Sequence, residues 1–116
     1  MFHYIIFKIK KIALSGSCVL VGRAADYVLR DNKNVVKIFI YAPTDYRIKN
    51  VMKMYKDTEK EAKKNINRSD KNRASYYKTI SGDVWGKMEN YDLCIDSSIG
   101  AEKTAEIICE YINKRK

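Results

Sequence analysis

The sequence has few of the residues that interrupt or crosslink a chain. Among 116 residues there are one proline, five glycines, three cysteines and one histidine. So little Gly and Pro leaves scant room for linkers or low-complexity tracts. The cysteines, Cys18, Cys94 and Cys109, are odd in number and form no C-x-x-C pair, which argues against a disulfide framework and, with a single histidine, against a zinc site. We expect all three thiols to be buried as small hydrophobic groups.

Long hydrophobic runs are also missing. The N-terminal apolar stretch is interrupted by Lys8, so it fits neither a secretory signal nor a membrane span. We therefore expect a cytoplasmic protein without a membrane partner. The length fits one domain, residues 1–116, or a part of a larger one.

Positive charge is in excess, with 23 Lys and Arg against 14 Asp and Glu. A net charge of +9 favours an anionic partner such as phosphate, a nucleotide, nucleic acid or lipid headgroups. The basic residues are spread along the chain and form no stripe, and no RRM, KH or helix-turn-helix signature is present. A basic nucleic-acid-binding protein is thus the weaker alternative, and we expect no nucleic acid as partner.

Hydrophobic patterning predicts strands that alternate with helices. Apolar residues at helical spacing precede Gly16, which is placed to end a first helix. Thr44 is the expected N-cap of a second helix, and Thr58 with Glu61 forms a capping box for a third, more polar one. Ala101, Ala105, Ile108, Cys109 and Ile112 form the apolar stripe of a last helix. Continuous apolar runs predict buried strands at 18–21, 35–41 and 91–95.

This alternation predicts an α/β fold with a parallel sheet of about three strands. Such a thin sheet leaves an edge that a missing neighbour should cover, so we expect association with a second copy or a complementary piece.

Four segments resemble the cytidylate kinase-like family in their order and approximate spacing. They read GSCVLVGRAADYVLR (16–30), IFIYAPTDYRIKNVM (38–52), SDKNRASYYKTISGDVWG (69–86) and NYDLCIDSS (90–98). The resemblance covers nearly the whole chain beyond about residue 10. It implies a P-loop-kinase-like sheet with a helical lid at about 58–88, and a transferase of pyrimidine nucleotide metabolism that moves the γ-phosphoryl of ATP to cytidylate.

The resemblance also implies roles for individual residues. Arginines suit phosphoryl transfer because a planar, permanently charged fork binds phosphate bidentately. By family motif, Arg23 binds the monophosphate nucleotide, and Asp26 either orients Arg23 or caps the following helix. Arg47 lies in the first turn of its predicted helix, where the positive end of the dipole disfavours a cation, so it is either a ligand of the same anionic nucleotide or a solvated arginine on the outer face. Arg68, Asp70 and Arg73 lie in the lid segment, where arginines close over phosphates and the Asp contacts ribose or aligns an arginine. Tyr76, Tyr77 and Trp85 are expected to pack the lid against the body, and the Asp96-Ser97-Ser98 turn either approaches a base or caps the next helix.

One part of the family pattern is absent. A phosphate-binding loop needs a strand that feeds a Gly-rich turn, and Gly16-Ser17 instead precedes the predicted strand. Complete members of the family use ATP and Mg²⁺, but we expect neither to bind tightly here and assign no cofactor or metal ligand. The expected fragment is therefore inactive by itself. The alternative is a non-catalytic nucleotide-binding module or one subunit of a split enzyme.

Overall fold

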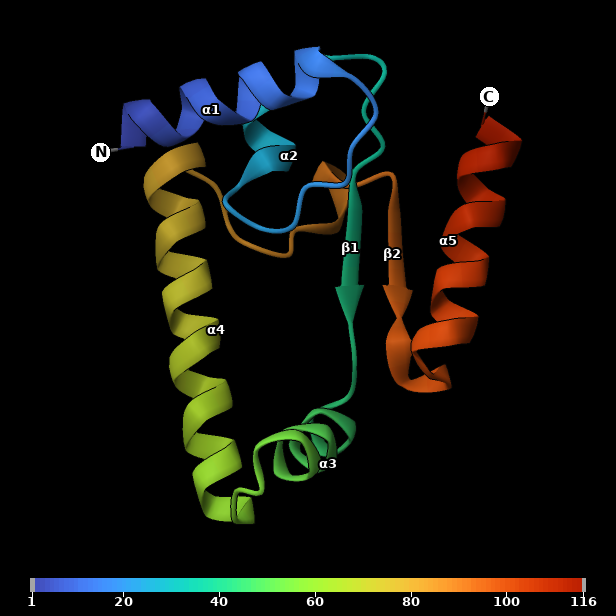
Figure 1. Cartoon of the computed structure of the whole chain (residues 1–116). Helices are drawn as coiled ribbons and strands as arrows, with labels where there is room; N and C mark the ends of the chain where they lie inside the picture. Colours follow the sequence, from blue (N-terminus) through green and yellow to red (C-terminus); the bar gives the residue numbers. More distant parts are fainter. Residues whose placement is uncertain (1, 116) are drawn as a thin grey trace.

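A computed structural model of the protein describes residues 2–115, with side chains from residue 5 onward (Figure 1). The main elements are α1 (Phe2–Ser15), α2 (Ala25–Val28), β1 (Ile38–Tyr41), α3 (Thr44–Tyr55), α4 (Glu59–Ser81), β2 (Leu93–Asp96) and α5 (Ala101–Arg115). Two short 3₁₀ segments, Met88–Asn90 and Ser97–Ile99, flank β2. Helices and strands mix as the sequence predicted, and helix predominates.

The sheet has two strands, not three. β1 and β2 pair in parallel, with Ile38 opposite Leu93 and Tyr41 opposite Asp96. The strand predicted at 18–21 is wrong: this segment has no strand assignment, and Val19 and Val21 are 90% and 89% exposed. Its apolar run suits a buried strand, but a strand needs a hydrogen-bonded neighbour. Within residues 2–115, β1 and β2 pair only with each other.

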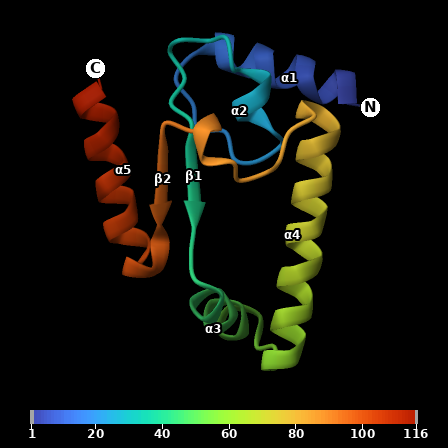
Figure 2. The same cartoon turned by 180° about the vertical axis from the view of Figure 1, so that it is seen from behind.

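Hydrophobic packing is divided between the two ends of α4. At its N-terminal half, Ala62 and Ile66 pack against Ile48 of α3. At its C-terminal end, Ile80 packs against a cluster that α1 and α2 share. Figures 1 and 2 show α4 as a long pillar with α3 beside one end and α1 and α2 beside the other, while the strands lie between α4 and α5. This arrangement makes α4 the element that joins the two packed regions.

Two of the helix ends test the expected caps. The Thr58 capping box is confirmed, because its side chain accepts from the Glu61 backbone N–H while the Glu61 carboxylate accepts from the Thr58 N–H. The N-cap predicted at Thr44 is wrong by one residue. Pro43 occupies that position, its extended backbone suits the entry to a helix, and Thr44 is already helical.

The last helix is less buried than its sequence suggested. Its buried residue is Thr104, whose hydroxyl donates to the Gly100 carbonyl, whereas Ala101, Ala105 and Cys109 are exposed. The prediction of three buried thiols is wrong for Cys18 and Cys109, which are exposed, while Cys94 is half-buried in β2. A thin sheet explains the exposure of Cys109, because it covers little of the α5 surface. None of the described helices is both long and apolar enough to cross a bilayer.

Candidate anion-binding site

One stripe of α4 brings together most of the residues that the sequence singled out. Asp70, Arg73 and Tyr77 recur at i, i+3 and i+7, so they share one side of the helix. The stretch from Asp70 to Tyr77 covers about 10 Å along the helix axis, at about 1.5 Å per residue. Contacts from α3 reach one end of this stripe, and contacts from the segment around α2 reach the other.

At the α3 end, two arginines converge on one carboxylate. Arg47 donates to both oxygens of Asp70, at 2.8 and 2.7 Å, in a fork-to-fork pair. Arg73 donates to Asp70 Oδ1 at 3.3 Å. The hydrogen bond from Arg47 is the main cause that holds the pKa of Asp70 below its ordinary value, so Asp70 is a carboxylate at neutral pH. The cluster thus presents two fixed cations around one anion.

The Arg47–Asp70 pair is partly shielded from water. The two side chains are 32% and 29% exposed, whereas Arg73 is 58% exposed. Only one terminal nitrogen of Arg73 bonds Asp70, which leaves its other donors toward solvent. Of the two arginines, Arg73 is the one better placed to accept an incoming anion directly.

At the other end, Arg23 sits in an unusual turn. Gly22, Arg23 and Ala24 all have left-handed backbones, with φ of 72°, 59° and 55°. Such a conformation costs roughly 1–2 kcal/mol for each non-glycine residue. The Arg23 guanidinium carbon lies 6.0 Å from the centre of the Tyr76 ring, at the outer range of a cation–π contact.

Asp26 follows that turn and joins it to α4. Its carboxylate accepts a hydrogen bond of 2.8 Å from the hydroxyl of Tyr77, which is only 4% exposed. Burial, and then the bond to Asp26, raise the pKa of Tyr77 well above its ordinary value. Burial likewise raises the pKa of Tyr91 to about 12, with a contribution from the Asp26 charge. The sequence identified Tyr77 as a packing residue, which is confirmed, but nothing in it indicated this specific partner.

Comparison with known proteins assigns the chain to a family. A family model described as the cytidylate kinase-like family matches residues 4–99. The chain belongs to the cytidylate kinase-like family. Membership suggests a nucleotide kinase-type function and, in complete enzymes, the use of ATP and Mg²⁺. A comparison with curated proteins found no match.

A solved structure is similar to this chain over nearly all of its length. It is the crystal structure of an uncharacterized protein from Eubacterium ventriosum, 31% identical, with a TM-score of 0.85. The similarity covers 97% of this chain but only 63% of the other one. The chain therefore spans less than two thirds of that protein, which has further residues without a counterpart here.

Arg68 lies apart from the other predicted site residues of this cytidylate kinase-like chain. Its side chain is exposed and donates to Asn65 at 3.0 Å. It lines a shallow groove of about 360 Å³ together with Lys64, Asn67, Lys71 and Asn72. Arg68 and Arg73 are five residues apart, so they point to different sides of α4. Arg47, Asp70 and Arg73 thus meet at one end of the stripe, Arg23 and Asp26 contact Tyr76 and Tyr77 at the other end, and Arg68 belongs to neither group.

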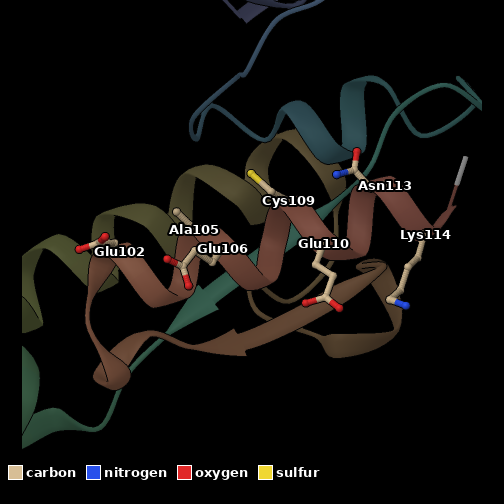
Figure 3. A pocket seen from close by; sticks show the side chains of 7 residues that line it. All are labelled: Glu102, Ala105, Glu106, Cys109, Glu110, Asn113 and Lys114. Carbon is tan, nitrogen blue, oxygen red and sulfur yellow. The ribbon is translucent and has the colours of Figure 1, made fainter.

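The larger hollow also lies away from that stripe. About 770 Å³ in volume, it runs along α5 beside Glu102, Ala105, Glu106, Cys109, Glu110, Asn113 and Lys114 (Figure 3). All of these residues belong to one helix, and three of them are carboxylates. Because carboxylates repel phosphate, this surface does not suit the nucleotide that the family binds.

Two further features limit the chemistry of the described residues. The Asp96 side chain accepts from the Ser98 N–H, and Ser97 donates to the Tyr41 carbonyl, so the turn after β2 caps the next short helix and ties it to β1. Among the side chains of residues 5–115, no three from His, Cys, Asp or Glu gather closely enough to hold a metal ion.

Proposed function

We propose that this chain forms the acceptor-binding and lid part of a nucleoside monophosphate kinase-type phosphotransferase, which converts ATP and cytidylate into ADP and CDP. The observation that supports it best is the convergence of Arg47 and Arg73 on Asp70, on the same α4 stripe whose tyrosines contact Arg23 and Asp26. Catalysis of phosphoryl transfer is largely positioning and electrostatic stabilisation, for which clustered arginines are suited.

In this proposal the site residues have different roles. Arg23 and Arg73 bind the phosphate of the monophosphate, because each keeps guanidinium donors that no contact described above takes up. Arg47 can bind the phosphate only if it gives up its hydrogen bonds to Asp70. In the ligand-free chain, Arg47 and Asp70 instead hold α3 against α4. Asp70 aligns Arg73, and Asp26 supports the turn that carries Arg23. Arg68 would reach a ligand only on the outer side of α4.

Donor binding is the part that these residues do not supply. Within the described chain, β1 is followed by Ala42-Pro43, and β2 is followed by the short 3₁₀ segment Ser97–Ile99 and a single glycine, Gly100. Neither offers the run of glycine backbone N–H groups that cradles ATP phosphates. We therefore expect these 116 residues alone to bind cytidylate without transferring a phosphoryl group to it.

The experiment is a pair of measurements on the purified 116-residue chain. Calorimetric titration with cytidylate, uridylate, adenylate and inorganic phosphate should show binding, strongest for a pyrimidine monophosphate. A coupled assay for ADP, with ATP, Mg²⁺ and cytidylate, should show no turnover above background. Cytidylate-dependent ADP formation would refute the claim of inactivity, and no binding of any monophosphate would refute the acceptor site. An Arg73→Gln variant is the matched control, because it should lose phosphate affinity while leaving the Arg47–Asp70 pair in place.

The open edge of the two-stranded sheet suggests that another segment or chain pairs with it. Pairing leaves one edge of β1 without a described neighbour, and Ile40 and Tyr41 on that strand are 53% and 48% exposed. The similar Eubacterium ventriosum protein has further chain, more than a third of its length, beyond the region that matches. We propose that an additional segment of this kind, or else a second copy, covers the edge and the exposed valines at 19 and 21. Sedimentation at several concentrations tests this: a chain that stays monomeric up to about 100 μM, and that a peptide from the unmatched part of the Eubacterium ventriosum protein does not stabilise, would contradict it.

A further inference from the structure

The turn that carries Arg23 is held in an unfavourable shape. Arg23 and Ala24 adopt a left-handed conformation although neither is glycine. Strain of this kind persists where surrounding contacts over-determine it. Within the turn, the Ala25 N–H donates to the Gly22 carbonyl at 3.2 Å and the Val28 N–H to the Ala24 carbonyl at 3.0 Å. These local bonds are weak support for so short a helix, so contacts from elsewhere must contribute.

Two elements supply such contacts: Ile9 of α1 lies in one buried cluster with Ala25 and Val28, and α4 adds a hydrogen bond. The Tyr77 hydroxyl donates to Asp26 across 51 residues of sequence, at 2.8 Å, and this bond joins a buried tyrosine to a half-buried carboxylate. A hydrogen bond to a charged group is stronger than one between neutral groups. Ile80, one turn farther along α4, packs against the hydrophobic cluster that contains Ala25 and Val28. Tyr77 thus gives α4 a directional bond next to a non-directional apolar contact.

This hydrogen bond joins two segments that each carry one arginine of the proposed acceptor site. Tyr77 is one helical turn beyond Arg73, and its partner Asp26 is three residues after Arg23. A hydrogen bond specifies distance and angle, whereas apolar packing tolerates sliding of one surface over another. Without the bond, α4 and the Arg23 turn would still touch, but the separation of the guanidinium groups would vary.

We propose that Tyr77 is a positioning residue that, through Asp26, holds the left-handed Arg23 turn against α4, so that Arg23 and Arg73 engage the same anionic ligand, a phosphate monoester. The inference rests on the proposed function for the identity of the ligand, but the holding of the turn is a property of the ligand-free chain. Tyr77 itself contacts no reacting group in this proposal.

The first test needs no ligand. Tyr77→Phe removes only the hydroxyl, and Tyr55→Phe makes the same change on a tyrosine that is 66% exposed. Amide hydrogen exchange in the two variants should differ locally: Val28 and Leu29 should exchange about tenfold faster in Tyr77→Phe and unchanged in Tyr55→Phe. Unchanged exchange at Val28 and Leu29, or an equal increase at amides of α3, would overturn the proposal. Asp26→Ala removes the acceptor instead, and decides the question if Tyr77→Phe fails to fold.

The second test separates positioning from general destabilisation. Cytidylate affinity is measured by calorimetry for the wild type, Tyr77→Phe, Arg23→Gln and the double variant. If Tyr77 acts through Arg23, Tyr77→Phe should weaken binding about tenfold alone and less than twofold in the Arg23→Gln background. Equal losses in both backgrounds would overturn the proposal. A wild type that binds no cytidylate or phosphate would refute the proposed function, and the exchange measurement would still decide the role of Tyr77.

Discussion

Replacing Asp70 by Asn should destabilise the chain by breaking the contact between α3 and α4. The Asn amide keeps the shape of the side chain, but it has one oxygen where the Arg47 fork needs two. Exposed ion pairs contribute about 0.2–1 kcal/mol, and breaking a fully buried one costs about 3–5 kcal/mol. With both side chains about 30% exposed, we place the loss between these limits, at about 1–2 kcal/mol.

Urea unfolding, followed by the fluorescence of the single tryptophan, measures this loss. Trp85 packs edge-on against Phe39 of β1, with ring centres 5.7 Å apart, so its emission should change when the sheet unfolds. For an m value of about 1.5 kcal/mol/M, a loss of about 1.5 kcal/mol moves the midpoint by about 1 M. The control is Glu106→Gln, which neutralises an exposed carboxylate on α5 and should change stability by less than about 0.5 kcal/mol.

The pH dependence gives a second, independent check. The pKa of Asp70 is lowered in the folded chain, chiefly by the Arg47 hydrogen bond, so the folded state binds its proton less readily than the unfolded state does. Its contribution is present above the unfolded pKa, about 3.9, and is lost as pH falls through the lower folded value. Below about pH 4, wild type and Asp70→Asn should therefore converge in stability. Equal midpoints for Asp70→Asn and Glu106→Gln at pH 7, or a gap between wild type and Asp70→Asn that does not narrow as the pH falls below 4, would refute the argument.

Two further changes test other parts of the fold. Gly86→Ala should lower the free energy of unfolding by about 1–2 kcal/mol more than Gly82→Ala does. Both glycines have positive φ, but only at Gly86 would a new Cβ lie 3.2 Å from the Phe39 ring. Equal midpoints of the two variants in urea would show that this contact is unimportant. Stability should also fall as pH rises from about 10 to about 12, because unfolded tyrosines ionise near pH 10 while the raised pKa values of Tyr77 and Tyr91 keep the folded ones protonated. Tyr77→Phe should make this fall shallower in urea titrations at pH 9, 10 and 11, and the same slope as in wild type would contradict it.

Local signals in the sequence were sufficient for the helices and for the family. The Thr58 capping box, the apolar spacing of α3 and the glycine after α1 depend on neighbours within a few residues, so they can be predicted from the sequence alone. The order of four motifs along the chain likewise sufficed for the resemblance that the family comparison confirmed. The individual roles of the six candidate residues stay predictions, since no comparison tests them.

Only the tertiary structure decided which residues meet. The run at 18–21 has the composition of a buried strand, yet it has no strand neighbour among residues 2–115, and burial depends on neighbours rather than on composition. The same holds for Cys18 and Cys109, which are exposed because no layer covers them. The bonds from Arg47 to Asp70 and from Tyr77 to Asp26 join residues 23 and 51 positions apart. Such contacts are set by the packing of α4 against α3 and α2, which no local pattern in the sequence records.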